Sequence, residues 1–205
     1  MTTATAALGP SLPVRLPVLA DVLPGRRVRD VVLVLGAALL TALLAQVALP
    51  VAGSPVPVTG QTLAVVLTAA ALGPARGVSA QALYLALGAA GLPFYSDASG
   101  GYEVVLGATG GYLLGFLPAA WLIGVAARHG RDRRVLQAVP LFLLGQAVVF
   151  AVGVPWLAVV ADLTASQALS AGLYPFLVGG AVKAVVAGLL LPSCWRLTGP
   201  TSHRG

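Results

Sequence analysis

The run FLVGGAVKAVVAGLLL, residues 176–191, contains one charged side chain, Lys183, among apolar and small residues. Its length approaches the roughly 20 apolar residues with which a helix spans a bilayer. A charged side chain inside hydrocarbon costs about 3 kcal/mol on insertion scales, so such residues usually have a function or a partner. The run therefore predicts a membrane helix whose ammonium group needs an acceptor.

The composition of the whole chain also places it in a membrane. Of its 205 residues, 58% are hydrophobic and only 9% are charged, and the mean hydropathy is +0.94. Residues 1–30 are too polar to insert, and they lack the basic head, apolar block and cleavage site of a secretory signal peptide. We expect them to form a cytoplasmic tail with an interfacial turn near residues 17–23.

Apolar runs separated by turn residues predict six transmembrane helices in an all-α compact bundle. We expect a membrane domain of residues 31–195 and a short C-terminal tail, residues 196–205. The second and third helices are short for a full crossing, which indicates that they border a cavity. The predicted spans are residues 31–49, 58–72, 78–90, 104–127, 135–160 and 169–195.

The distribution of charge predicts the orientation of the bundle. The formal net charge is +6, and the arginines fall in predicted loops or tails on one side of the membrane. The loops on the other side carry only Asp97, Glu103 and Asp162. Cytoplasmic loops are enriched in Lys and Arg, so we expect both termini in the cytoplasm and the chain in the plasma membrane. This pattern explains the net charge without nucleic-acid binding.

Small residues recur at four-residue spacing on the first, third and fourth predicted helices. Gly107, Gly111 and Gly115 form such a stripe on the fourth, which predicts close packing inside the bundle. Ala38 and Ala42 form a shorter stripe on the first helix. For these two alanines, packing inside the bundle and docking of a partner membrane protein are equally favoured.

No catalytic constellation is visible in the sequence. His129 and His203 fall in a loop and a tail, so no nucleophile and base meet at membrane depth. Cys194 is the only cysteine, which excludes a disulfide or a cysteine metal cage within the chain. We therefore expect neither an enzyme nor a cofactor or metal site. A membrane enzyme would need a reactive pair that the sequence does not show.

Polar residues of neighbouring predicted spans lie at a depth similar to that of Lys183. Thr59, Gln61 and Thr62 open the second span, and Tyr84 lies in the third. Together with the ammonium group they predict a pocket for an anionic or strongly dipolar small molecule. The alternative is that Lys183 stretches to the membrane interface or pairs with a backbone carbonyl.

Four motifs, in this order, resemble the BioY family, the biotin-specific S components of energy-coupling-factor (ECF) transporters. The resemblance extends over about residues 30–195. The motifs are PVTGQTL at 57–63, ALGPARGV at 71–78, LYLALGAAGLPF at 83–94 and GATGGYLLGF at 107–116.

The resemblance implies a substrate and partners. A family member would capture biotin from the outer face with high affinity, within the lipid bilayer. It would assemble with a transmembrane coupling protein and two ABC-type ATPases, which would hydrolyse the ATP. Small residues on the first helix, here Ala38 and Ala42, would dock the coupling protein.

The resemblance also implies ligand contacts. Gln61, Tyr84 and Lys183 match family residues in the second, third and last helices. Phe94 and Thr109 lie within the quoted motifs and are further candidates for contact with the substrate.

Position 180 departs from the family pattern, in which an Asp precedes the lysine by three residues. This chain has Gly180, which can neither neutralise Lys183 nor accept a hydrogen bond through a side chain. Asp162, Glu103, Asp97 or the ligand carboxylate could substitute, or the position was altered from Asp. The departure leaves open an S component for a different vitamin-like molecule. If biotin is the ligand, Gly180→Asp is expected to tighten its binding.

Overall fold

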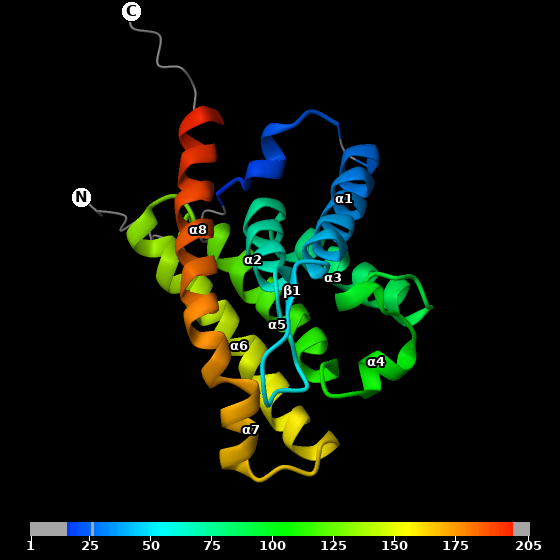
Figure 1. Cartoon of the computed structure of the whole chain (residues 1–205). Coiled ribbons are helices and arrows are strands. Elements are labelled where there is room, and N and C mark those ends of the chain that lie inside the picture. Colours follow the sequence, from blue (N-terminus) through cyan, green and yellow to red (C-terminus); the bar gives the residue numbers. More distant parts are fainter. Residues whose placement is uncertain (1–15, 26, 199–205) are drawn as a thin grey trace, which may run out of the picture.

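The structure is a computed structural model that describes residues 16–25 and 27–198, and its described part contains eight α-helices (Figure 1). Two short 3-10 helices, η1 (Leu19–Val22) and η2 (Ser96–Ala98), lie before α1 and α4. Strands β1 (Ala48–Leu49) and β2 (Val58–Thr59) pair antiparallel, with Ala48 opposite Thr59. The α-helices are α1 (Arg27–Ala45), α2 (Gln61–Leu72), α3 (Pro74–Ala89), α4 (Tyr102–Leu106), α5 (Gly110–Ala127), α6 (Val135–Val160), α7 (Ala165–Gly172) and α8 (Tyr174–Thr198).

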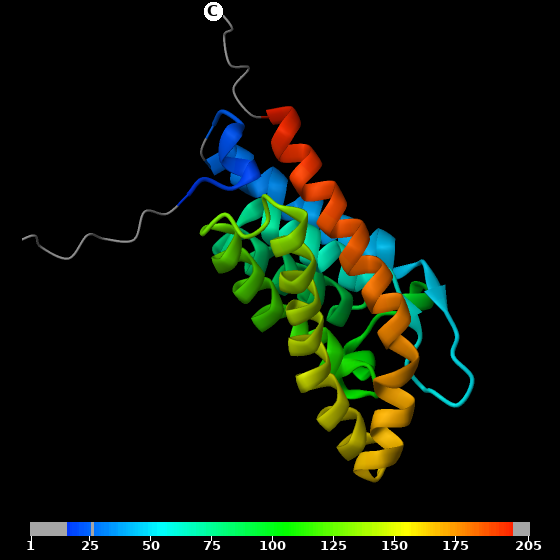
Figure 2. The ribbon, with the colours of Figure 1, turned by 90° about the vertical axis from the view of Figure 1, so that its left-hand side faces the viewer.

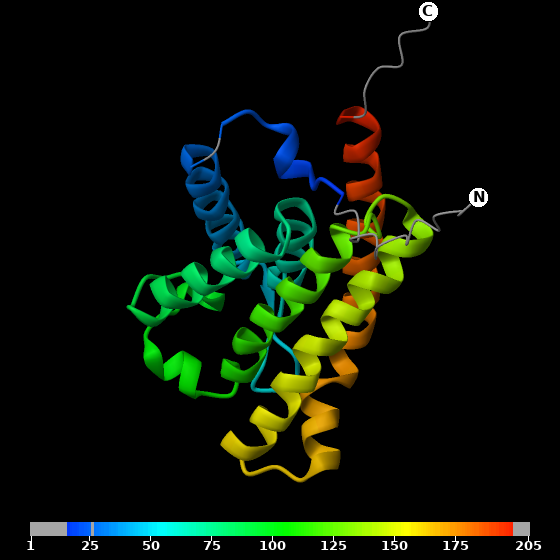
Figure 3. The ribbon, with the colours of Figure 1, turned by 180° about the vertical axis from the view of Figure 1, so that it is seen from behind.

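Helix α5 is the central helix of the bundle and packs against α2, α3 and α6. The long helices α6 and α8 run side by side, and α7 joins them at one end (Figure 2). Helix α1 packs on α3 and α2 on the other side of the bundle (Figure 3). Phe116, Ile123 and Phe142 are almost fully buried in the core between α5 and α6. This arrangement leaves α2, α5, α6 and α8 around one interior region.

The two ends of the bundle differ in composition. At the end we call the terminal end lie η1, the start of α1, the turn between α2 and α3, the turn between α5 and α6, and the end of α8 (Figure 1). At the opposite end, the loop end, lie the β1–β2 hairpin, η2, α4 and α7. Every described arginine belongs to the terminal end, whereas Asp97, Glu103 and Asp162 belong to the loop end.

A mostly helical membrane fold is confirmed, although the prediction of an all-α bundle did not include the short β1–β2 pair. Four helices, α1, α5, α6 and α8, are long and apolar enough to cross a membrane. Helices α2 and α3 have 12 and 16 residues and are shorter than a standard span. The predicted turn near residues 17–23 is present as η1. Residues 1–15, 26 and 199–205, and with them parts of both predicted tails and His203, lie outside the described residues.

Several predicted boundaries were wrong. The first span ends at Ala45, not at 49, because residues 48–49 pair with 58–59. The fourth is interrupted at residues 107–109, where the backbone of Gly110 comes so close to the carbonyl of Val105 that a Cβ atom there would overlap it.

The sixth predicted span is two helices, α7 and α8. Leu173 between them has non-helical dihedral angles (φ −126°, ψ −60°). Pro175 follows at the second position of α8, and a proline inside a continuous helix lacks the N–H for a bond to the carbonyl four residues earlier and its ring clashes with that carbonyl, so a helix breaks just before it. The arginines at positions 27, 29, 76 and 196 lie in the end turns of helices rather than in loops.

The small-residue stripes are mostly packing surfaces. A Cβ atom on Gly111 would overlap the side chain of Trp156, and one on Gly115 would lie 3.0 Å from Cα of Val149, so α5 and α6 approach closely there. Gly107 lies outside α5. Ala38 and Ala42 have 1% and 7% of their surface exposed, and Ala42 also lines an open groove on the outer surface, so the choice between bundle packing and partner docking stays a prediction.

Candidate functional site

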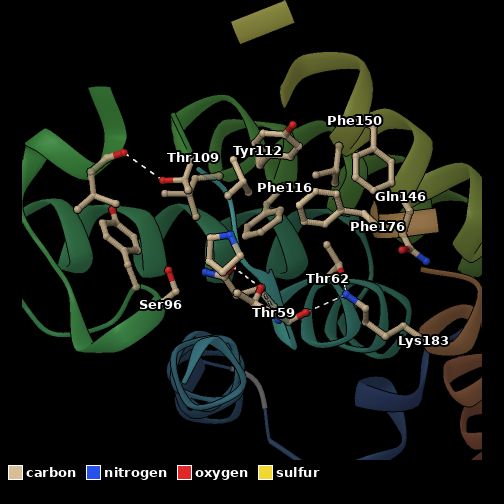
Figure 4. Close-up of a pocket in the computed structure, with 17 residues that line it drawn as sticks. Thr59, Thr62, Ser96, Thr109, Tyr112, Phe116, Gln146, Phe150, Phe176 and Lys183 are labelled. Atoms are coloured by element: carbon tan, nitrogen blue, oxygen red, sulfur yellow. Dashed lines mark hydrogen bonds between the residues drawn. The ribbon is translucent and has the colours of Figure 1, made fainter. Parts of the chain in front are cut away.

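A cavity of about 50 Å³ lies between α2, α5, α6 and α8, beneath the β1–β2 hairpin and η2 (Figure 4). Its walls combine aromatic rings with isolated polar groups, the composition expected of a small-molecule site. The polar and charged lining residues are Thr59, Gln61, Thr62, Ser96, Thr109, Gln146 and Lys183, and the aromatic ones are Tyr95, Tyr112, Phe116, Phe150 and Phe176.

Lys183 reaches from α8 to the start of α2. Its Nζ atom donates to the backbone carbonyl of Thr59 and to the hydroxyl of Thr62, each at 2.8 Å (Figure 4). Among the described residues, no carboxylate lies within 4.0 Å of this ammonium group. The lysine is therefore held by neutral acceptors and also lines the cavity. Both predicted features, a pocket beside Lys183 and its pairing with a backbone carbonyl, are present together.

Gln61 is fixed in orientation by two neighbours. Its Oε1 atom accepts from the hydroxyl of Thr59 at 2.7 Å, and its Nε2 atom donates to the hydroxyl of Tyr84. Tyr84 is fully buried and does not line the cavity. Its ring stacks on Phe94, with 6.5 Å between the ring centroids, and Phe94 does not line the cavity either. Tyr84 therefore holds the Gln61 amide, and Phe94 packs against Tyr84.

The remaining predicted site residues also separate into two groups. Thr109, at the start of α5, lines the cavity, and its hydroxyl donates to the carbonyl of Val104 at 3.3 Å. Gly180 is not among the lining residues and lies instead against Gln146 of α6. Gln61, Thr109 and Lys183 thus meet at the cavity, whereas Tyr84, Phe94 and Gly180 do not.

Sequence reasoning missed the aromatic wall. Tyr112, Phe150 and Phe176 come from three helices, and their ring centroids lie 6.1 to 6.3 Å apart. The hydroxyl of Tyr112 donates to the carbonyl of Gly172 at 2.9 Å, which links α5 to α7. Aromatic residues in an apolar helix look the same whether they face a core or a cavity, so the sequence gives no signal for Phe150 and Phe176, and the signal for Tyr112 is its place in the motif at 107–116.

Gln146 was also missed, although a signal was present. It is the polar residue near the middle of the predicted span 135–160, and it is 4% exposed. It lines both the cavity and an apolar groove of about 450 Å³ on the outer surface between α6, α7 and α8. Phe150 lines the same two spaces, so these two side chains separate them.

At the terminal end, a carboxylate is enclosed by cations. Asp21 of η1 accepts from Arg76 and Arg128, each at 2.7 Å, and from the backbone N–H of Val18 at 3.2 Å. Partial burial opposes ionisation of Asp21, but these hydrogen bonds and charges outweigh it and lower its pKa. Asp21 thereby ties the N-terminal segment to α3 and to the end of α5.

A second carboxylate at this end is buried. Asp132 is fully buried and accepts from the indole N–H of Trp195 in α8 at 2.7 Å. The guanidinium of Arg133 lies over the Trp195 ring, 4.2 Å from its centroid. Burial raises the pKa of Asp132, although the Trp195 hydrogen bond and the Arg133 charge oppose this shift. In the described part of the chain, no group of three or more potential metal ligands is present.

Comparisons with known proteins agree on one family. The model of the BioY family matches residues 14–200. A relative from Rhodobacter capsulatus named biotin transporter BioY is 38% identical over 173 residues, which cover 79% of this chain and 90% of the relative. Another of the same name from Thermotoga maritima is 39% identical over 137 residues, covering 66% and 79%.

One solved structure has the same fold. It is described as the S-component for biotin from an ECF-type ABC transporter, and it aligns with a TM-score of 0.77 at 24% identity. The alignment covers 82% of this chain and 92% of that one.

Proposed function

The chain belongs to the BioY family, and on that basis we propose that it is the high-affinity biotin-binding S component of an ECF-type importer. In this role it captures biotin at the loop end of the bundle, from outside the cell. Its relatives named biotin transporter BioY and the fold of a biotin S-component support this proposal.

The observation that carries the proposal is that Lys183 lines the cavity and has only neutral hydrogen-bond partners among the described residues. Its ammonium group lines a cavity and has a carbonyl and a hydroxyl as partners, each at 2.8 Å. Neutral partners leave the positive charge without a counter-charge, so an oxygen atom of a polar or anionic ligand gains a strong hydrogen bond there. Biotin offers such oxygen atoms in its ureido ring and in its carboxylate.

The rest of the cavity suits the other parts of biotin. The fused rings and aliphatic chain are largely apolar, and the rings of Tyr112, Phe150 and Phe176 provide an apolar wall. The amide of Gln61 is held by Thr59 and Tyr84, so it meets the ligand with little loss of side-chain entropy.

The membrane topology forms part of the proposal. Six helices, α1, α2, α3, α5, α6 and α8, form the membrane domain in the plasma membrane, with both termini in the cytoplasm. The arginines of the described residues gather at the terminal end, which supports a cytoplasmic location for that end. Residues 1–30 and 196–205 are then the cytoplasmic tails, except that α1 and α8 extend to Arg27 and Thr198.

The proposed partners are a transmembrane coupling protein and two ABC-type ATPases, which supply the ATP hydrolysis. The chain itself is a binding subunit rather than an enzyme. For docking of the coupling protein on α1, Ala42 lines an open groove on the outer surface, whereas Ala38 is 1% exposed and packs inside the bundle.

A second candidate is an S component for a different vitamin-like molecule, and the glycine at position 180 favours it. Competition separates the two candidates. Excess unlabelled riboflavin, thiamine or pantothenate should leave labelled biotin bound, whereas displacement by one of them would favour the second candidate.

The proposal is tested with the full chain purified in detergent. Native mass spectrometry should show copurified biotin, and calorimetry on ligand-free protein should give tight one-to-one binding. Absence of biotin binding by a folded, monodisperse preparation would contradict the proposed function.

A further inference from the structure

Gln146 is a polar side chain in the apolar middle of α6, at the cavity wall formed by α6 and α8 (Figure 4). Its Nε2 atom donates to the backbone carbonyl of Gly180 at 2.8 Å. A carbonyl can only accept, so this contact requires the amide nitrogen to face the carbonyl of Gly180 and fixes which of the two amide positions is the oxygen. The orientation of the Gln146 amide is therefore determined by α8.

The Oε1 atom of Gln146 has no donor among the described residues. This oxygen is not among the buried unpaired side-chain atoms of the described residues, so part of its surface stays open to water or to a ligand. Gln146 is 4% exposed and lines the cavity. Its oxygen is thus an acceptor held in place for a donor that enters the cavity.

Position 180 explains why this amide fits. A Cβ atom at Gly180 would lie 2.6 Å from Oε1 of Gln146, closer than real Cβ atoms approach. A side chain at position 180 would therefore displace the amide from its place. Conversely, a side chain at position 180 would enter the volume that the Gln146 amide now fills. Positions 146 and 180 thus share one volume at the cavity wall.

We propose that Gln146 is a specificity-determining residue whose Oε1 atom accepts a hydrogen bond from a ureido N–H of biotin. This inference rests on the proposed function. The ureido ring carries two N–H donors, and an unpaired donor in an aromatic cavity would be costly. The acceptor is neutral and lies in the same cavity as the cation Lys183, so the site favours a neutral urea over a cationic ring.

The first test removes the acceptor while preserving most of the volume. Gln146→Met should weaken biotin binding about tenfold to a hundredfold, because the ureido N–H loses its acceptor inside the site. Gln146→Met should weaken the binding of biotin amide by a similar factor, because in biotin amide the carboxylate is blocked but the ureido ring is intact. Thermal unfolding in detergent shows whether the variant keeps its fold.

The second test moves the acceptor from α6 to α8. In Gln146→Ala/Gly180→Asp, a carboxylate enters the volume vacated by the amide, and biotin affinity should recover most of the loss seen in Gln146→Ala. The matched control Gln146→Ala/Gly180→Ala offers no acceptor and should not recover. Gly180→Ala alone should weaken binding, because its methyl group displaces the Gln146 amide.

The third test changes the ligand. In 2-iminobiotin a guanidine replaces the urea and is protonated at neutral pH. The wild type should discriminate against it, and both Gln146→Glu and the double variant with Asp at 180 should reduce that discrimination at least about tenfold, since a carboxylate compensates the added charge. A merely structural role of Gln146 would not change this ratio.

The outcomes separate this inference from the function on which it rests. If the wild type binds biotin and folded Gln146→Met binds it equally well, Gln146 is not the acceptor and the proposed function stands. The inference would also be overturned if Gln146→Glu and Gln146→Ala/Gly180→Asp fold and bind biotin, but the ratio of their affinities for 2-iminobiotin and biotin equals that of the wild type. If the folded wild type does not bind biotin, both proposals fall.

Discussion

Each end of the bundle holds a buried or half-buried charge, but the partners differ. At the terminal end, the carboxylate of Asp21 is enclosed by Arg76 and Arg128 at 2.7 Å. At the cavity, the ammonium of Lys183 has only a carbonyl and a hydroxyl, each at 2.8 Å. A charge with permanent opposite partners stabilises one structure. A charge with neutral partners remains available to a ligand, and this difference separates a structural site from a binding site.

The largest expected effect is on the ligand side of this comparison. Lys183→Met should weaken biotin binding by about 2–3 kcal/mol, or roughly 30- to 150-fold, because a hydrogen bond from a charged donor is lost. The free energy of unfolding should not fall, since the methionine has no charge to bury. Calorimetry and thermal unfolding measure the two quantities, and an unchanged dissociation constant would remove Lys183 from the site.

The next largest effect is expected on stability, at the Asp21 site. Asp21→Asn should reduce the free energy of unfolding by about 1–2 kcal/mol, because two partly buried ion pairs lose their anion. Asp30→Asn is the matched control, since the side chain of Asp30 is 41% exposed and its pairs are better solvated. Denaturant titrations in detergent should show a loss for Asp21→Asn and little for Asp30→Asn, with biotin affinity unchanged in both.

The same carboxylate predicts a pH dependence. Its folded-state pKa is lowered below the ordinary value of 3.8, so the stabilisation is fully present above 3.8 and is lost as the pH falls through the lowered pKa. The difference in stability between wild type and Asp21→Asn should therefore be constant at neutral pH and shrink in acid below 3.8. A difference that grows with acid would contradict the ion-pair account.

A smaller effect on affinity tests the support behind the cavity. Tyr84→Phe removes the hydroxyl that receives Nε2 of Gln61, so the amide loses one of its two anchors. Biotin affinity should fall by less than about tenfold, near 1 kcal/mol. Tyr102→Phe is the control, because Tyr102 is 64% exposed. A loss as large as that of Lys183→Met would mean that Tyr84 contacts the ligand itself.

The smallest expected effect is an increase, rather than a decrease, in the free energy of unfolding. Asp132 is buried and its pKa is raised, so its ionisation destabilises the folded state at neutral pH. Asp132→Asn keeps an acceptor for the Trp195 indole and should change stability by about 1 kcal/mol or less, in the stabilising direction. As the pH falls through the raised pKa, the wild type should gain stability relative to the variant. A clear loss in Asp132→Asn at neutral pH would show that its charge is required.

The sequence predicted the class, the family and the central lysine for physical reasons. Hydropathy marks long apolar helices such as α6, and a lone charge such as Lys183 is conspicuous in apolar surroundings. Gln61 and Thr109 were found because they lie in recognisable motifs. Both residues lie at the start of a helix, Gln61 in α2 and Thr109 just before α5, and both helix starts border the cavity.

Other features depend on packing that a linear pattern does not contain. Tyr84 and Phe94 match the family motifs, yet neither side chain lines the cavity. The breaks at residues 107–109 and 173 occur inside apolar stretches, so hydropathy runs through them. Gln146 pairs with Gly180 across 34 positions, and only the packing of α6 on α8 brings the two together.

The thin wall made by Gln146 and Phe150 has a practical consequence for anyone handling the protein. On one side of it lies the cavity proposed to bind biotin and on the other an open apolar groove that acyl chains can fill. The choice of detergent or lipid is therefore expected to affect the measured affinity, since an acyl tail bound in the groove would contact Phe150 from the side opposite the cavity. Titrations repeated in nanodiscs and in detergents of different chain length would show how far the surroundings set the measured Kd.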